Sequence, residues 1–549
     1  MFEKLTPQIT VKHLIRFFLI TLVLGILTQI VGIFLLANSV KVQQGNVKSN
    51  QLISNAADML LTVSNYSPHV VIASTFAGDS KTVRLIKIAD ASAQLLRQSG
   101  SVISGFSESK DFSDFLSNKN GAAQIQEVSV IASPVITSIL NLVQGSDGGE
   151  TIDQIFGRSI RKPVRLLKSV SELGRHAEVL SGCGKKSRFL VLLTSNAETR
   201  SIGGLIGQYV TVVSNCGDLE IVRAGINTDL KDSGELNKNF KQFPGLYQSP
   251  IPEWINSNLI PDGIEVSQSW IRAYEEQFDE ILDGVLVLDT LLLSEFAALQ
   301  GGFSAADGTK LSTSAEIDAY LRNGMYFQFP EDNILRKQHL LEITEQLAES
   351  LNFSTLTKTG MLPVLMSAFG EDRILFALNS KLHTQAVLEH LSWSGKQSST
   401  IFIGVNNLSA SKFDFYSKYR VQVNKCSDLN YSIQFRVKNN ALVNLKYPEY
   451  VARRLDDYPI DKIGVVNQFL FSFDKSIVRV TGEKTPAFSD YRVIRGESNR
   501  DLISVIEFIE AQEKYEFSIR LKSKKNLAFR MWGQELKVSE SSSVPCQVR

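Results

Sequence analysis

The stretch LVLLTSNAETRSIGGLIGQYVTVV, residues 190–213, decides how the rest of the chain is interpreted. Two apolar runs flank a polar insert that carries Glu198, Arg200 and three glycines. Apolar, β-branched runs bounded by turn residues predict strands, and glycines allow backbone conformations that side chains forbid. We therefore predict two strands joined by a turn at the start of a folded domain.

The charged residues of the insert allow two interpretations. In the first, Arg200 binds a phosphate through two hydrogen bonds, Glu198 orients it or binds a metal ion, and Gly203 and Gly204 allow close approach. In the second, Glu198 and Arg200 form a structural ion pair that holds a bend, and spacing alone favours this second interpretation. The GGxxG pattern is a weak nucleotide signal, because it lacks the full dinucleotide fingerprint and no Walker lysine follows.

Cysteines lie on either side of these strands. Cys183 precedes the first strand and Cys216 follows the second. If the strands pair antiparallel, both cysteines lie at the same end and a disulfide is geometrically plausible, which leaves Cys426 to pair with Cys546. An even number of cysteines fits an oxidising compartment. The alternative is four free, buried thiols in a cytosolic protein.

Strands and helices alternate further along the chain. The apolar runs DGVLVLD, RILFAL and TIFIGVN are interleaved with amphipathic patterns such as VSQSWIRAYEEQF and ILRKQHLLEITEQLAESL. This alternation indicates an α/β domain with a largely buried, mixed sheet, which we place at residues 182–412. Residues 413–549 carry strand patterns with almost no helix, so we expect a C-terminal β-sandwich.

Two more places in the α/β domain carry candidate functional side chains. Asp289 ends an apolar strand directly before a helix, where open α/β sheets bind ligands, but an aspartate there can equally cap the helix. Arg336 and Lys337 lie in the first turns of an amphipathic helix and oppose its dipole, which indicates an anionic partner. The alternative for this pair is a solvated helix face.

The N-terminal part predicts membrane attachment. Residues 17–40 contain no charge, and their length exceeds the roughly 20 residues that a helix needs to span a bilayer core. The run is too long for a signal peptide and lacks a cleavage pattern. We expect a transmembrane helix there, after a cytoplasmic tail at 1–16, an orientation that a slight basic bias supports. Residues 41–181 show mostly helical patterns and are expected to form a stalk or bundle.

Composition and missing motifs narrow the function. The chain has 58 Lys and Arg against 57 Asp and Glu, so it lacks the basic bias of a nucleic-acid binder. Its six histidines show no metal-ligand spacing, and it contains no G-x-S-x-G or CxxC motif. Hydrolase and zinc-enzyme functions are therefore poorly supported.

Several segments together resemble a bacterial family labelled domain of unknown function 4012. FLVLLTSNAETRSIGGLIGQYVTV resembles its signature, LDGVLVLDTLLLSEFAALQGG its second motif, and VNNLSASKFDFYSKYRVQV, with Asn407, Lys412 and Asp414, its third. VKNNALVNLKYPEYVARR is similar to the start of its C-terminal β region. The resemblance extends from about Cys183 to Arg454. It implies a single-span membrane protein with most of the chain outside the cytoplasm. We also expect Asn407 and Lys412 to contact a ligand.

A more distant resemblance is to the LytR-CpsA-Psr family, which transfers lipid-pyrophosphate-linked glycopolymers to the cell wall. It implies that Arg200 and Arg336 bind the phosphates, while Asp289 or Glu198 acts in catalysis and holds a divalent metal such as magnesium. The chain departs from that family at INTDL, where Asp229 is retained without the arginine. We expect a membrane-anchored protein of envelope glycopolymer assembly whose partners are the membrane and a lipid-linked glycopolymer or cell-wall glycan. The alternative is a non-catalytic scaffold or a module that binds glycan or protein.

Overall fold

The computed structural model describes a defined part of the chain. The described residues are 121–127, 129–130, 174–216, 218–247, 253–349, 364–365, 367–368, 371–382, 399–427, 429–456, 462–484, 490–497, 499–533, 536 and 538–540. The expected tail at 1–16, the transmembrane helix at 17–40 and most of 41–181 lie outside them. Within the described ranges, no helix is long and apolar enough to cross a membrane.

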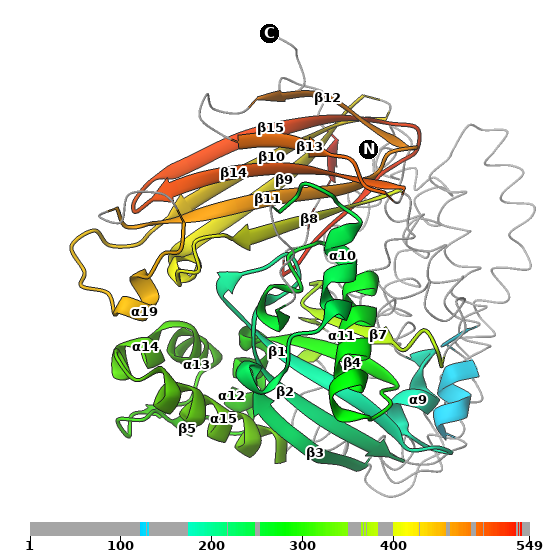
Figure 1. The fold of residues 1–549 in the computed structure, drawn as a ribbon, viewed down its shortest axis with the longest axis vertical. Coiled ribbons are helices and arrows are strands. Elements are labelled where there is room, and N and C mark those ends of the chain that lie inside the picture. The colour runs from blue at the N-terminus through cyan, green and yellow to red at the C-terminus, as the bar shows by residue number, and fades with distance from the viewer. Residues whose placement is uncertain are drawn as a thin grey trace, which may run out of the picture. The chain divides into compact units, whose positions relative to one another are not determined.

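The chain forms two compact units. One contains helix α9 (Ala177–Ser181) and both Cys183 and Cys216. The other spans Lys186–Ser214, Leu219–Thr355 and Met361–Arg549 and holds nearly all of the described elements (Figure 1).

A mixed five-stranded sheet organises the α/β region, in the order β3-β2-β1-β4-β7. Its strands are β1 (Ser187–Thr199), β2 (Gly204–Asn215), β3 (Asp218–Ile226), β4 (Gly284–Asp289) and β7 (Ile374–Leu378). β1 pairs antiparallel with β2 and parallel with β4, and β4 pairs antiparallel with β7. Residues 190–213 therefore form the predicted hairpin, and the expected mixed α/β sheet is confirmed.

Aspartates begin the three longest helices of this region. Asp262, Asp289 and Asp332 each accept a backbone N–H three residues later, which satisfies a donor that the first helical turn leaves unpaired. The helices are α10 (Lys238–Lys241), α11 (Gly263–Phe278), α12 (Thr290–Leu299), α13 (Ser314–Ala319), α14 (Met325–Gln328) and α15 (Asn333–Glu349), with a π-helical turn at Tyr320–Gly324. Short 3-10 turns lie at Asn227–Asp229, Gly234–Asn237 and Trp254–Asn256, and β5 (Phe303–Ser304) pairs with β6 (Lys310–Leu311).

The C-terminal part consists mostly of strands, in two five-stranded sheets. The first has the order β13-β14-β11-β8-β16 and the second β12-β15-β10-β9-β17. The first sheet contains β8 (Thr400–Asn407), β11 (Gly464–Asp474), β13 (Asp490–Ile494), β14 (Arg500–Glu510) and β16 (Ala528–Met531). The second contains β9 (Ser417–Ser427), β10 (Asn430–Asn439), β12 (Val478–Lys484), β15 (Lys514–Ser523) and β17 (Val538–Glu540). A 3-10 turn at Phe413–Tyr416 and helix α19 (Glu449–Ala452) complete this region.

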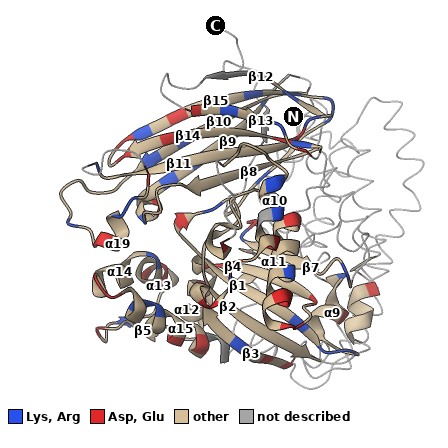
Figure 2. Ribbon diagram, in the orientation of Figure 1, with Lys and Arg blue, Asp and Glu red and all other residues tan. Residues whose placement is uncertain are grey.

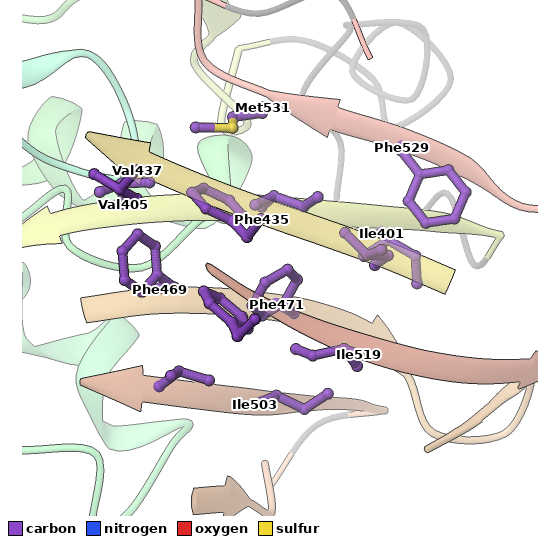
Figure 3. Packing of buried hydrophobic residues seen from close by; sticks show 14 of the residues in the cluster. Ile401, Val405, Phe435, Val437, Phe469, Phe471, Ile503, Ile519, Phe529 and Met531 are labelled. Atoms are coloured by element: carbon purple, nitrogen blue, oxygen red, sulfur yellow. The ribbon is translucent and has the colours of Figure 1, made fainter. Parts of the chain in front are cut away.

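One hydrophobic core joins these two sheets. Phe469 and Phe471 on β11 contact Phe435 on β10 of the other sheet (Figure 3). They also contact Phe517 on β15 of that sheet. These four rings are at most 2% exposed. Because burial of aromatic surface is among the largest favourable terms in folding, this cluster accounts for much of the stability of the region.

The structure corrects the expected position of one strand. TIFIGVN was expected among the α/β strands, but β8 pairs with β11 and β16 in a C-terminal sheet. The predicted division at residue 412 therefore separates β8 from the sheet to which it belongs. The reason is that β8 is buried along its whole length, so its sequence resembles a parallel α/β strand.

Charged residues of both signs are interspersed over the described elements (Figure 2). This distribution agrees with the balanced composition of the whole chain. Arg200, Arg336 and Lys412, in contrast, are buried.

Candidate functional site

Glu198 and Arg200 face each other at the end of β1. Arg200 Nη2 lies 2.6 Å from Glu198 Oε1, and both side chains are about 95% buried. Arg200 Nη1 also donates to the carbonyls of Thr199 and Asn407, and Nη2 to Asn256 Oδ1. The ion pair that spacing favoured is therefore present.

Lys412 completes a buried three-charge cluster. Its Nζ donates to Glu198 Oε2, so each oxygen of this carboxylate contacts a cation. Burial opposes ionisation of Glu198, but Arg200 and Lys412 together lower the pKa of its carboxyl below the usual value. Burial likewise disfavours the charged lysine, but Glu198 raises the pKa of Lys412. Both groups are therefore ionised at neutral pH.

Asp414 links the third motif of the sequence to the hairpin. Its carboxylate accepts hydrogen bonds from the Thr199 backbone at 2.8 Å and hydroxyl at 2.9 Å, from Asn407 Nδ2 at 2.8 Å, and from Tyr419 and Asn467. Asn407 accepts from Ser409 and donates to the Ser411 carbonyl. A buried carboxylate with this many donors serves to hold segments together, since leaving such groups unpaired is costly.

The turn between β1 and β2 docks on β8. Ser201 donates its backbone N–H to Asn406 Oδ1 at 2.7 Å and its hydroxyl to the Leu259 carbonyl at 2.8 Å. Opposite it stands Gly404, where an added Cβ would lie only 1.9 Å from Ser201 Oγ. The hairpin turn and the C-terminal sheet are therefore interlocked through a polar seam that excludes a side chain at residue 404.

Gly203 and Gly204 are required by the backbone. Gly203 has φ +79°, and an added Cβ would lie 2.5 Å from Thr194 Oγ1. A Cβ at Gly204 would lie 2.2 Å from the Ser195 carbonyl oxygen. Close approach of β1 and β2 explains both glycines, so neither requires a ligand.

Arg336 lies beside this cluster, against two tyrosines. Its guanidinium carbon is 4.5 Å from the ring centroid of Tyr326 and 5.4 Å from that of Tyr450, and these two rings are stacked. Lys412 Nζ is 5.1 Å from the same Tyr450 ring, so the tyrosine joins Arg336 to the three-charge cluster. The structure thus brings together Glu198, Arg200, Asn407, Lys412 and Arg336.

Arg336 is a buried cation without a buried anion. It is 6% exposed, and within the described ranges its side chain donates only to Asn333 Oδ1 of its own helix. Among the described residues, no carboxylate lies within ion-pair distance of it. A buried charge ordinarily requires a partner, and cation–π contacts with Tyr326 and Tyr450 supply only part of the lost hydration. We call Arg336, Lys337, Lys412, Tyr326 and Tyr450 the cation site.

Lys337 adds a further positive charge to the cation site. Burial lowers the pKa of its ammonium, and the neighbouring Arg336 and Lys412 lower it further, against the opposing effect of Asp229. Its Nζ donates to Asn227 Oδ1 at 3.1 Å. Three cations that influence one another in this way form a locally positive region, which can bind an anion.

Asp289 lies elsewhere and has a different role. It caps α12 through Leu292 and pairs with Arg373, whose Nε is 3.2 Å from Asp289 Oδ2. Along the parallel pair of β1 and β4 it lies opposite Thr194, which is four residues, or about 13 Å of strand, before Glu198. Asp289 therefore belongs to a separate cluster with Arg373, Glu295 and Glu371.

The candidate carboxylates do not fit a magnesium site. Both oxygens of Glu198 contact cations, and those of Asp289 bond to Arg373 and the α12 backbone. In the part of the chain that the structure describes, no group of three or more His, Cys, Asp or Glu side chains is placed to hold a metal ion. These two carboxylates therefore leave no oxygen free to bind a divalent metal ion.

The cysteines at the ends of the hairpin are joined. Cys183 and Cys216 form a disulfide with a Cα–Cα distance of 4.2 Å. Cys426 is also disulfide-bonded, and its expected partner Cys546 lies outside the described residues.

Sequence reasoning missed several residues of this site. Tyr326 and Tyr450 carried no signal as single aromatics, and Arg373 was not considered beside Asp289. Asn256 and Thr199 contribute hydrogen bonds that depend on the tertiary fold. Tyr450 lies within the segment VKNNALVNLKYPEYVARR, which resembles the start of the family's C-terminal β region. This placement was its one sequence signal for a role in the site.

The sequence comparisons agree with one of the two resemblances. Residues 185–326 match the family model described as "Protein of unknown function (DUF4012)". This match runs from the start of the hairpin to Tyr326 of the cation site and supports the resemblance to that family. The sequence matches no curated protein. The resemblance to the LytR-CpsA-Psr family stays a prediction.

Proposed function

We propose that this chain is a membrane-anchored, extracytoplasmic protein of cell-envelope glycopolymer assembly that binds an anionic, lipid-linked phosphate at the cation site. The observation that carries the proposal is Arg336, which is buried beside Lys337 and Lys412 and has no carboxylate partner among the residues that the structure describes. A phosphate group offers the negative charge that Arg336 lacks and several oxygens that accept charge-assisted hydrogen bonds.

The expected location supports this proposal. The uncharged run at residues 17–40 is long enough for a membrane anchor. The Cys183–Cys216 disulfide fits an oxidising compartment outside the cytoplasm. A folded region anchored at the extracytoplasmic face of the membrane is close to lipid-linked envelope precursors.

We propose binding rather than group transfer. A general base or nucleophile needs a carboxylate oxygen that can reach the substrate. The oxygens of Glu198 and Asp289, the two candidate catalytic residues, are already engaged by cations or by a helix N-terminus. A carrier or scaffold that presents its ligand to another protein is therefore the preferred form of this function, which favours the non-catalytic alternative.

The test is pyrophosphate binding by the full-length chain in detergent. We expect Arg336→Gln to weaken binding by about tenfold to a hundredfold, the equivalent of one lost charge-assisted hydrogen bond of roughly 1.5–3 kcal/mol. The matched control is Arg492→Gln, because that exposed arginine on β13 pairs only with Asp490. Isothermal titration calorimetry gives the affinity, and thermal unfolding shows whether each variant is folded.

Two outcomes contradict the proposal. One is a wild-type chain that does not bind pyrophosphate. The other is an Arg336→Gln protein that binds as tightly as the wild type while its unfolding temperature falls, which would make Arg336 a purely structural residue.

A further inference from the structure

Exposed apolar side chains border the cation site. Phe327 directly follows Tyr326, and Ile334 and Leu335 directly precede Arg336. A second group lies in the loop between β10 and α19, where Leu442 is 58%, Val443 57% and Leu445 39% exposed. We call these six residues the apolar rim.

Tyr447 links the two halves of the rim. The Phe327 ring lies 6.4 Å from Tyr447, which ends the loop that carries Leu442, Val443 and Leu445. The neighbouring Tyr326 and Tyr450 rings stack 5.7 Å apart and hold Arg336 between the same two segments. The apolar rim and the cation site therefore share one scaffold of tyrosines.

The loop of the rim is held in place by its own hydrogen bonds. Leu442 donates its N–H to Tyr447 Oη at 2.7 Å, and the Leu445 N–H bonds to the Leu442 carbonyl. Gln512 Nε2 donates to the Ala441 carbonyl. Exposure of the three side chains is thus fixed by the fold. Because large apolar side chains lose the favourable free energy of burial by staying in water, such an exposed group indicates a contact surface.

Resting on the proposed function, we propose that the apolar rim enters the surface layer of a lipid bilayer and so places the cation site at lipid phosphates. Apolar side chains next to cations match the two parts of an anionic lipid, its chain and its headgroup. The chain next to the rim carries charges of both signs, Lys446 and Arg453 against Glu449. We therefore expect Arg336 and its neighbouring lysines to provide the preference for anionic lipid, and the rim to insert into the surface layer of the bilayer.

The test measures whether the rim touches hydrocarbon. The full-length chain is mixed with phosphatidylcholine vesicles that contain phosphatidic acid and carry brominated acyl chains, which quench nearby tryptophan. We expect Val443→Trp to lose most of the fluorescence it adds to the parent protein. Ile281→Trp is the matched control, since Ile281 is 67% exposed and lies before the N-terminal end of β4, whereas Glu198 lies at the opposite end of the sheet. It should keep its added fluorescence.

Separate arms distinguish this proposal from the function on which it rests. Leu442→Ser, Val443→Ser and Leu445→Ser combined should abolish vesicle contact, reported by Phe327→Trp, yet bind soluble pyrophosphate as the wild type does. Arg336→Gln in the Val443→Trp protein should remove the difference between vesicles with and without phosphatidic acid. Equal, weak quenching of Val443→Trp and Ile281→Trp overturns the lipid contact and leaves a protein partner as the rim's occupant, whatever the pyrophosphate result.

Discussion

At the scale of single residues, the central feature is a carboxylate held between two cations. Glu198 contacts Arg200 through one oxygen and Lys412 through the other, with almost no exposure to water. Such an arrangement is not by itself a large source of stability, because both signs lose hydration on burial. Its removal on one side is costly, because it leaves buried charges without compensation.

Glu198→Gln should therefore destabilise the protein by about 3–5 kcal/mol at neutral pH, as judged by urea unfolding. The folded state lowers the pKa of Glu198 from its usual 4.5, so its contribution is fully present above pH 4.5 and is lost as pH falls through the lower, folded value. The difference between wild type and variant should accordingly shrink in acid. Glu235→Gln, at a partly exposed ion-pair residue, should cost less than about 1 kcal/mol. If the difference in unfolding free energy between wild type and Glu198→Gln stayed the same at low pH, Glu198 would not be an ionised partner of Arg200 and Lys412.

The sequence predicted part of this site. Glu198 and Arg200 are two residues apart, so their pairing could be proposed from spacing. Lys412 lies 214 residues from Glu198, and no local pattern specifies such a contact. Arg336 was singled out by its unfavourable position in the helix dipole, but its contacts with Tyr326 and Tyr450 depend on tertiary packing.

At the scale of elements, the local sequence predicted most helices and strands, but it did not predict which elements pack or pair with one another. The cap at Asp289 and the glycines after the hairpin's first strand have local causes, and they could be read from the sequence. β11 is hard to recognise from its sequence, although it is buried along its whole length. Its apolar run is interrupted by Asn467, Gln468 and Ser472, whose polar groups are satisfied only by the tertiary hydrogen-bond network.

Asp289→Ala tests the role of this residue in its element. The substitution removes the cap of α12 and one partner of Arg373, so we expect a loss of about 2–4 kcal/mol in unfolding free energy. Pyrophosphate binding should not change, because Asp289 does not contact the cation site. Thr313→Ala removes a cap without an ion pair and should cost only about 1 kcal/mol. If folded Asp289→Ala protein lost pyrophosphate binding, Asp289 would have to be part of the ligand-binding site.

At the scale of the whole described unit, a polar seam fastens the α/β sheet to the C-terminal sheets. Thr199 and Ser201 bond to Asp414 and Asn406, and Gly404 leaves room for Ser201. The two regions that composition separates near residue 412 are therefore not independent. No sequence pattern indicated this, because each side of the seam is locally an ordinary turn or strand end.

Gly404→Ala should weaken this attachment. The new methyl group would overlap Ser201 Oγ and Cβ, and we expect a loss of about 1–3 kcal/mol in unfolding free energy. Hydrogen exchange should also become faster at the Ser201 amide, which bonds to Asn406 across the seam. Gly234→Ala, where an added Cβ meets nothing within 4 Å, is the control and should change neither quantity. Unaltered exchange at Ser201 would show that the seam tolerates a side chain.

The same seam sets the order in which the protein can be completed during synthesis. Thr199 leaves the ribosome 215 residues before Asp414, and Glu198 leaves it 214 residues before Lys412. At a translation rate of about 5–20 residues per second, that interval lasts roughly 10–40 s. Throughout this time Glu198 lacks the positive charge of Lys412, and the Thr199 N–H lacks its acceptor on Asp414. The signature segment of the α/β region is thus made early but reaches its final surroundings only when the C-terminal strands emerge.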